Sequence, residues 1–245
     1  MTTIVKLGGS VITEKDRAET LDGEALNQAA DALARAEDLV VVHGGGSFGH
    51  HHAEHHGVST TEGSSDPDAV IDIHTAMVTL NQFVVARLRK RDVPAVPVHP
   101  LSAADRDGEG TLTLPAGAPA RLLAEGYVPV LHGDVVAHAG EGVTVLSGDE
   151  IVASLASSLS AERVGVCSAV PGVLDDDGEV IEEVHAFADV EGVLGGSDAT
   201  DVSGGMAGKV QELLGLETPA EIFDLDSLDA FLAGEKPGTT LYGDT

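Results

Sequence analysis

Cysteine and aromatic residues are scarce in this chain of 245 residues. Cys167 is the single cysteine, so no internal disulfide can form and the sequence fits a reducing compartment. Tryptophan is absent, and aromatic residues make up only 3% of the chain. Because 42% of the residues are still hydrophobic, we expect a core of Val, Leu, Ile and Ala, large enough for one α/β domain or two small lobes.

Basic residues are also few. The chain has 13 Lys and Arg against 41 Asp and Glu, a formal net charge of −28 that argues against nucleic acids or anionic membranes as partners. We find no signal peptide and no apolar run of membrane-spanning length, so a cytoplasmic location is expected. Such acidity resembles that of proteins adapted to high salt, where screening makes self-repulsion tolerable.

Lysine occurs at only five positions, and three of them lie in or beside glycine-rich segments: Lys6, Lys15 and Lys209. A compact ammonium aimed at phosphate oxygens is a common use of such a charge. The plain alternative is that Lys15 and Lys209 are solvated surface residues. The scarcity of lysine favours the phosphate interpretation.

The segment LVVVHGGGSFGHHHA, residues 39–53, combines a buried strand with a glycine-rich turn. Glycines 44–46 carry no Cβ, so backbone N–H groups can approach an anion, and Ser47 is expected to cap the following helix. The start of a helix adds partial positive charge, and His50 lies about one turn into it. We therefore interpret the segment as a phosphate cradle.

Two alternatives to this interpretation stay open. Gly44, Gly46 and Gly49 also satisfy the G-x-G-x-x-G pattern of dinucleotide-binding turns. That fold requires another strand, ending in an acidic residue roughly 20 positions on. Residues 57–66 are instead polar and rich in glycine and serine, and a long helix is expected after them. The second alternative is a tight strand-to-helix turn that binds no ligand.

Short apolar runs alternate with helical patterns along the rest of the chain. This order predicts an α/β fold with a mainly parallel sheet and helices on both faces. Asp22 and Asp226 are expected to cap helices, Asp66 precedes another helix start, and a hairpin is expected around Asp107. The expected strands are 2–5, 39–42, 95–99, 128–131, 143–146, 163–167, 221–225 and 239–242, and the expected helices are 22–37, 66–91, 119–125 and 151–159.

Glycine-rich loops at 6–10, 43–49 and 204–209 suggest more phosphate than one small anion carries. They fit a nucleotide facing a phosphorylated acceptor, in a site that aligns the two ligands and neutralises charge on the moving phosphoryl group. Lysines and Mg²⁺ can supply that positive charge. Asp149, in the first turn of an expected helix, is placed to hold two ammonium groups by ion pairing.

No serine or cysteine is expected to act as a nucleophile, because Ser47 and Ser147 are more simply helix caps. The histidines of 50–56 raise the possibility of a metal site, against the usual alternative of adventitious binding by a histidine tract. A phosphate monoester has its second pKa at about 6, so as an acceptor it needs no general base. It needs a hydrogen-bond donor, and His50 can be that donor.

Five segments together resemble the amino acid kinase family: KLGGS at 6–10, VHGGGSFGHHHA at 42–53, HGD at 132–134, LSGDE at 146–150 and TDVSGGMAGKV at 200–210. The extension after the triple glycine is similar to that of the isopentenyl phosphate kinases, with the fosfomycin kinases close behind. The resemblance implies an open αβα sandwich in which residues 1–160 bind the acceptor and residues 161–245 bind ATP. Residues 168–172 depart from the family, in which many members carry an acidic residue there.

The resemblance also implies an activity. It is ATP-dependent phosphorylation of isopentenyl phosphate to isopentenyl diphosphate, in an alternative mevalonate route, by a cytoplasmic homodimer with Mg²⁺ held mainly by the nucleotide. A sibling kinase with another phosphate, phosphonate or carboxylate acceptor is one alternative, and a non-catalytic nucleotide or oxyanion sensor is the other. The full set of Lys6, Lys15, Asp149 and Lys209 discriminates between kinase and sensor, since a sensor need not keep it.

Residue roles follow from the same resemblance. The catalytic set would be Lys6, Lys15, His50, Asp149 and Lys209. The ATP-binding residues would be Lys6, Gly8, Gly9, Ser10, Gly46, Asp149, Gly204, Gly205 and Lys209. The acceptor would be bound by Gly45, Gly46, His50 and Gly133, and no residue is expected to bind a metal directly.

Overall fold

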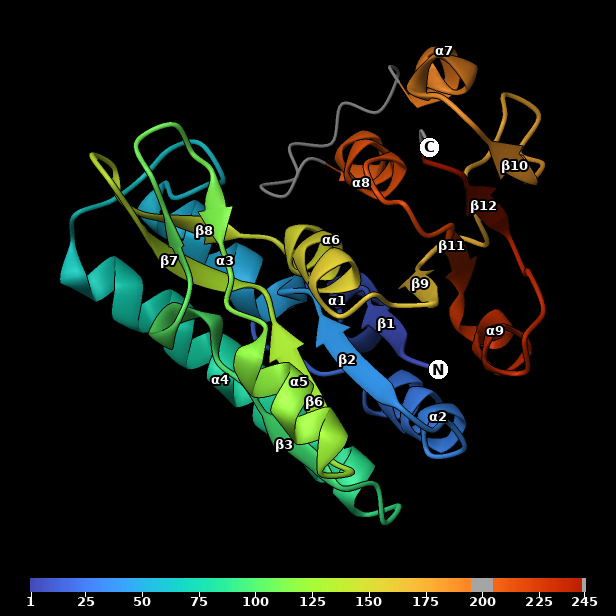
Figure 1. Cartoon of the computed structure of the whole chain (residues 1–245). Coiled ribbons are helices and arrows are strands. Elements are labelled where there is room, and N and C mark those ends of the chain that lie inside the picture. The colour runs from blue at the N-terminus through green and yellow to red at the C-terminus, as the bar shows by residue number, and fades with distance from the viewer. Residues whose placement is uncertain (195–204, 244–245) are drawn as a thin grey trace.

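The computed structural model describes residues 1–194 and 205–243, and one eight-stranded sheet runs through them (Figure 1). In spatial order its strands are β10 (Glu183–Val184), β12 (Thr239–Leu241), β11 (Ala220–Asp224), β9 (Arg163–Ser168), β1 (Thr3–Leu7), β2 (Leu39–His43), β6 (Val128–His132) and β3 (Ala95–Pro97). Among these described strands, only the pairing of β11 with β12 is antiparallel. The predicted mainly parallel α/β sheet is therefore confirmed.

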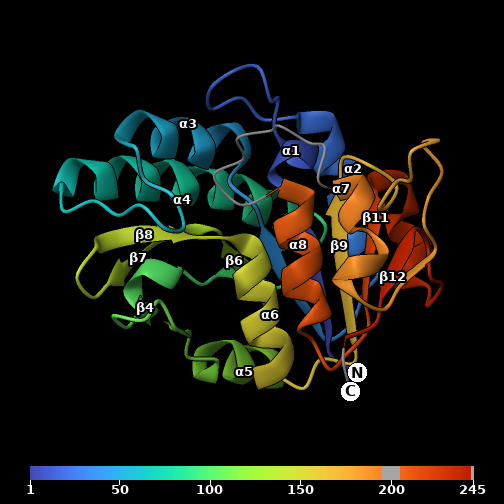
Figure 2. The same ribbon diagram turned by 90° about the horizontal axis from the view of Figure 1, so that it is seen from above.

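Helices cover both faces of the large sheet (Figure 2). The helices are α1 (Gly9–Ile12), α2 (Gly23–Leu33), α3 (Gly46–His56), α4 (Pro67–Arg89), α5 (Gly117–Ala124), α6 (Gly148–Ser158), α7 (Glu191–Leu194), α8 (Gly205–Leu214) and α9 (Leu228–Leu232). Helices α2, α4 and α9 pack on one face, and α6 and α8 pack on the other. The three layers form the expected αβα sandwich.

The strands β1 and β2 show why both faces must be covered. Ile4 and Val40 point into the core under α6 and α8, whereas Val5 and Val41 point into the core under α2 and α4. All four side chains are fully buried, as is usual for apolar strands in the middle of a parallel sheet. The apolar runs seen in the sequence are thus strands that contribute to two cores at once.

A second sheet of four short strands lies beside the sandwich. Its order is β5 (Leu112–Thr113), β4 (Asp105–Arg106), β7 (Asp134–His138) and β8 (Gly142–Leu146). Gly133 alone separates β7 from β6, so the chain leaves the large sheet and enters the small one within a single residue. The expected hairpin around Asp107 is confirmed, with β4 and β5 antiparallel and the Asp107 carboxylate accepting from two N–H groups of the turn.

Two predicted helix caps are wrong. Gly45 precedes α3, and the N–H of Ser47 donates to Thr13 Oγ1, so Ser47 lies inside the first turn instead of capping it. The side chain that accepts at the start of the short 3₁₀ helix η3 (Leu225–Ser227) is Asp224, not Asp226. The caps at Asp22 and Ser147 are confirmed, and α2 ends at Leu33 rather than near residue 37.

Helix α4 is long and apolar enough to cross a membrane by length and composition, contrary to the expectation that no such run exists. It packs against α2, α3 and strands β3, β6 and β7. Its buried residues include Ile73, Met77, Leu80 and Val84, spaced as one helical face. In this fold α4 is a helix of the outer layer whose apolar stripe covers the sheet and α3.

Candidate active site

A cavity of about 460 Å³ lies where the strands β1, β2 and β6 end. The carboxyl edge of an open parallel sheet is where such folds bind ligands, because loops and helix starts converge there. The predicted site residues that line it are Lys6, Gly8, Gly9, Ser10, Lys15, Gly45, Gly46, His50, Gly133, Asp149 and Lys209. Gly205, the first residue of α8, is outside this lining, and Gly204 lies outside the described residues.

Two glycine turns form the floor of the cavity by packing backbone against backbone. A Cβ added to Gly9 would lie 2.6 Å from the Cα of Gly46 and closer still to its nitrogen. Gly46 itself has a φ of +50°, a left-handed conformation that favours glycine. The turns after β1 and β2 can therefore touch only because both positions are glycine.

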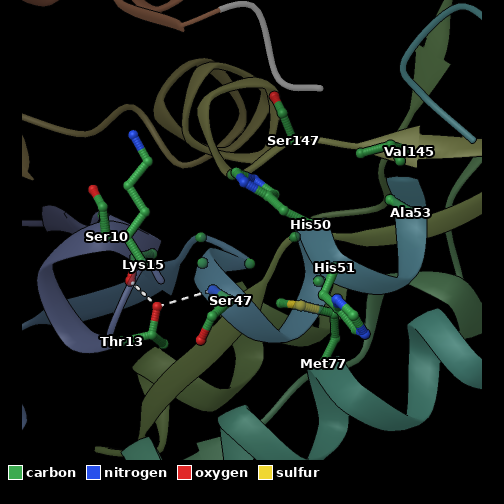
Figure 3. A pocket seen from close by; sticks show the side chains of 18 of the residues that line it. Ser10, Thr13, Lys15, Ser47, His50, His51, Ala53, Met77, Val145 and Ser147 are labelled. Carbon is green, nitrogen blue, oxygen red and sulfur yellow. Dashed lines mark hydrogen bonds between the residues drawn. The ribbon is translucent and has the colours of Figure 1, made fainter. Parts of the chain in front are cut away.

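Thr13 ties the same two turns together (Figure 3). Its hydroxyl donates to the carbonyl oxygen of Gly9 at 2.8 Å and accepts from the N–H of Ser47 at 3.0 Å. The side chain is 3% exposed. No sequence pattern marks this threonine, which lies six positions after the end of β1, so it was not among the predicted site residues.

A buried carboxylate holds two lysines together at the centre of the cavity. Asp149 Oδ2 lies 2.6 Å from Lys6 Nζ and 3.2 Å from Lys209 Nζ. Lys6 comes from β1, Asp149 from the first turn of α6, and Lys209 from α8, so the contact joins distant parts of the chain. Asp149 is fixed in turn because Ser147 and Glu150 form a capping box at the start of α6.

Burial and the attraction between Lys6 and Asp149 have opposite effects on the pKa values of these two groups. Burial lowers the pKa of Lys6 to about 8, helped by repulsion from Lys209 and opposed by Asp149. Burial alone would raise the pKa of Asp149, but the two lysines outweigh it and hold that pKa at about 2. Asp149 Oδ1 is buried without a hydrogen-bond partner in the described part of the chain. The site thus keeps two cations at the cavity, held by one carboxylate that has a second, unpaired oxygen.

Lys15 and His50 approach the cavity from different elements (Figure 3). Lys15 is exposed on the loop after α1, beside Ser10, and His50 is half-buried on α3. Figure 3 shows the His50 side chain extending toward Ser147 at the start of α6. The structure therefore brings the five predicted catalytic residues to one cavity, with Lys15 at its exposed rim.

An apolar wall completes the lining. Ile73 and Met77 come from α4, Ala53 from α3 and Val145 from β8. Met77 is buried among apolar side chains and also lines the cavity, so it belongs both to the core and to the wall. Asp134, buried beside the wall, accepts from His74 Nδ1 at 2.9 Å. Asp134 was quoted as part of a motif but given no role.

Two of the other histidines of α3, His52 and His56, lie against surface carboxylates. His52 Nε2 lies 2.7 Å from Glu19, and His56 Nε2 lies 2.9 Å from Asp72. Within residues 1–194 and 205–243, no group of three or more His, Cys, Asp and Glu side chains is arranged to hold a metal ion. These two histidines pair with acidic residues of the loop before α2 and of α4.

Comparison with known proteins identifies the family of this chain. The profile of the amino acid kinase family matches residues 1–216. The chain belongs to the amino acid kinase family. It is 58% identical over 244 residues to the isopentenyl phosphate kinase of Haloferax volcanii, an alignment that covers 98% of both chains. It is 29% identical to the isopentenyl phosphate kinase of Methanocaldococcus jannaschii, again over 98% of both chains.

Comparison with solved structures agrees with these sequence matches. An isopentenyl phosphate kinase structure superposes with a TM-score of 0.84 at 28% identity, covering 98% of this chain and 100% of the other. The Giardia carbamate kinase has a TM-score of 0.67 at 12% identity, which supports the shared fold alone. The family resemblance deduced from the five motifs is thereby confirmed.

Proposed function

We propose that this protein transfers the γ-phosphoryl group of ATP to isopentenyl phosphate, giving isopentenyl diphosphate and ADP. The observation that carries the proposal is the 58% identity, over nearly the full length, to an isopentenyl phosphate kinase. Acetylglutamate kinases, whose name implies a carboxylate acceptor, match less well, at 26% identity over 86% of this chain in one case. A sibling kinase is therefore not favoured. The assembled set of Lys6, Lys15, Asp149 and Lys209 speaks against a sensor.

The acceptor phosphate supplies the nucleophile. One of its oxygens forms a bond to the γ-phosphorus of ATP, the bond from that phosphorus to the β,γ-bridging oxygen breaks, and ADP leaves with the electron pair. Because the attacking oxygen is already ionised at neutral pH, the protein need not remove a proton. Its task is to bring two anions together and to neutralise the charge that moves between them.

The charged residues are assigned accordingly. Lys6 and Lys209 contact the ATP phosphates and the moving phosphoryl group, Asp149 orients both ammonium groups, and Lys15 adds positive charge from the rim. The ATP phosphates are assigned to the backbone of Gly8, Gly9, Ser10 and Gly46, to Gly205 at the start of α8, and to Gly204. Residues 161–245 supply the rest of the ATP site, and residues 1–160 supply the acceptor site.

The acceptor phosphate is assigned to Gly45, Gly46, His50 and Gly133. The apolar wall of Ile73 and Met77 lies on the same side of the cavity and fits an isoprenoid tail. The buried lysines and the glycine cradle fit a triphosphate, and Mg²⁺ would add charge neutralisation from the nucleotide side. We also propose that the enzyme is a cytoplasmic homodimer, as its resemblance to the family implies.

A panel of acceptors tests the proposal. ADP release is measured with isopentenyl phosphate, fosfomycin, acetylglutamate and no acceptor, at equal ATP. We expect ADP to form at least about 100-fold faster with isopentenyl phosphate than with the others, because the site must match both a phosphate and an apolar tail. A clear preference for fosfomycin or acetylglutamate would replace the substrate assignment, and equal slow rates with all four would favour a sensor.

His50→Ala is expected to weaken the acceptor complex and its transition state by roughly 1.5–3 kcal/mol, the range for a hydrogen bond to a charged group. The loss should be divided between a higher KM for isopentenyl phosphate and a lower kcat, while KM for ATP changes little. His50→Gln keeps a donor at similar reach and should retain more activity. His55→Ala, an exposed residue of the same helix outside the cavity, is the matched control. If His50→Ala leaves acceptor kinetics unchanged, or weakens ATP instead, this assignment fails.

Stability is expected to depend strongly on salt. At a net charge of −28, lowering ionic strength lengthens the screening distance and increases repulsion among surface carboxylates. We propose that the protein is halophilic: it should lose structure in dilute buffer and recover in molar KCl. The midpoint of thermal unfolding, followed by circular dichroism from low to molar KCl, measures this. A midpoint independent of salt would contradict the proposal.

A further inference from the structure

Two buried histidines end the neighbouring strands β2 and β6. His43 and His132 are register partners, both side chains are fully buried, and their rings stack with centroids 5.6 Å apart. Each ring Nδ1 lies at hydrogen-bond distance from the carbonyl oxygen of the next residue, 3.1 Å to Gly44 and 2.8 Å to Gly133. Both glycines line the cavity, so the same hydrogen bond from a buried histidine to a glycine carbonyl occurs twice beneath it.

The contacts around the rings determine which nitrogen carries the proton. A carbonyl oxygen can only accept, so Nδ1 of each ring must be the donor. His43 Nε2 then accepts from Asn81 Nδ2 at 3.1 Å, and that amide nitrogen also lies 3.4 Å from the carbonyl oxygen of Val130. His132 Nε2 accepts from His99 Nδ1 at 2.8 Å. Every contact agrees with the Nδ1-protonated tautomer in both rings.

Both rings are also neutral. Burial lowers the pKa of His43 to about 4 and that of His132 to about 3, even though Asp134 acts in the opposite direction on His132. A neutral ring has one donor and one acceptor, and both are used here. These histidines therefore act as hydrogen-bonding spacers rather than as charges.

The direction of the carbonyl groups bears on anion binding. In a trans peptide the C=O and the following N–H point in opposite directions. Because the Gly44 carbonyl points back to the buried His43 ring, the N–H of Gly45 points away from the core, toward the cavity that Gly45 lines. In the described part of the chain this N–H has no backbone partner. Gly133 N–H donates to the His43 carbonyl at 2.9 Å, which couples the two turns.

We propose that His43 and His132 are positioning residues of the acceptor-phosphate site, which hold the Gly44 and Gly133 carbonyl oxygens away from the bound dianion and leave the Gly45 N–H facing it. Neither ring touches the substrate. This inference rests on the proposed function, because it takes Gly45 and Gly133 as the acceptor-phosphate site. A carbonyl oxygen turned toward the phosphate would instead repel it.

Imidazole ¹⁵N spectroscopy of the whole protein tests the tautomers without any mutation of the site. At neutral pH both rings should show a protonated Nδ1 and an unprotonated Nε2, and neither should titrate above about pH 5, as expected for well-buried neutral rings. Signals are assigned in the wild type by through-bond correlation of each ring with its own backbone resonances. Protonation on Nε2, or an imidazolium at neutral pH, would overturn the inference.

Two substitutions of His43 separate positioning from simple packing. In His43→Asn the amide lies near the place of Nδ1 and can still donate to Gly44, whereas in His43→Gln it lies near Nε2 and cannot. We expect His43→Gln to raise KM for isopentenyl phosphate about tenfold or more, with KM for ATP within about twofold and a partial rescue in His43→Asn. Rates are compared well below each variant's unfolding temperature. His138→Gln, a histidine bonded to Thr144 in the small sheet, is the control.

The outcomes distinguish this inference from the function itself. If His43→Gln leaves acceptor KM unchanged while His50→Ala raises it, the positioning role is wrong and the substrate assignment stands. If the wild type does not phosphorylate isopentenyl phosphate, the function is wrong, and binding of inorganic phosphate to His43→Asn and His43→Gln still decides the positioning role. If both variants unfold, the ¹⁵N spectrum of the wild type decides it.

Discussion

Replacing Lys6 with alanine is expected to lower kcat by about 10²–10³-fold while the fold persists, the cost typical of removing one group that stabilises transition-state charge. Lys6 Nζ lies 2.6 Å from Asp149 and faces the cavity. Without it, one charge opposite the moving phosphoryl group is lost, and Lys209 remains paired with Asp149. Steady-state kinetics with saturating ATP and isopentenyl phosphate measure the effect, with circular dichroism as the check on folding.

Two variants accompany this experiment. Lys90→Ala removes an exposed lysine after α4 and should leave kcat unchanged. Lys6→Arg keeps a charge that does not titrate. In the wild type, kcat/KM should fall above about pH 8, because burial lowers the pKa of Lys6 to about 8 and the cation is lost there. That fall should be absent in Lys6→Arg. Near-normal turnover in Lys6→Ala would remove Lys6 from the mechanism.

Gly9→Ala is expected to have the other large effect. Its Cβ would lie 2.6 Å from the Cα of Gly46 and closer to the Gly46 nitrogen, and backbone atoms cannot move aside as a flexible side chain would. Overpacking of this kind costs about 1–3 kcal/mol or more, and here it would also separate the two turns that form the cradle. We expect a lower unfolding midpoint and loss of measurable phosphoryl transfer.

A second glycine serves as the control for this substitution. Gly23, the first residue of α2, has open space around the position of a Cβ, so Gly23→Ala should fold and turn over normally. If Gly9→Ala behaves like Gly23→Ala, the close contact of the two turns is not needed for activity. If it folds with normal stability but binds neither substrate, the cradle is confirmed as a functional rather than a structural feature.

The sequence was sufficient to predict which loops meet, because parallel strands bring their carboxyl ends to one edge. Lys6, at the end of β1, and Asp149, at the start of α6, were therefore correctly expected to lie together. The scarcity of lysine marked Lys209 as a candidate site residue, because the chain has few other cations. These predictions depended on local pattern, strand order, composition and the family resemblance.

Contacts between side chains distant in the sequence could not be predicted. Ser47 was expected to cap α3, but its N–H instead donates a hydrogen bond to the hydroxyl of Thr13, which lies on another loop. The bond from Asn81 to His43 depends on the rotation of α4 against β2, which no local pattern encodes. The motif HGGG marked the glycines of this turn, whereas the role of its histidine became visible only with the packing of β6 and α4.

Direct observation of the product tests the central claim most sharply. The protein is incubated with ATP, Mg²⁺ and isopentenyl phosphate in molar KCl and followed by ³¹P NMR. The account predicts that the single monoester signal is replaced by the two coupled signals of isopentenyl diphosphate, with one ADP formed for each, and that Lys6→Ala slows this conversion by about 10²–10³-fold. Release of inorganic phosphate without a diphosphate, or an unchanged monoester signal, would contradict it.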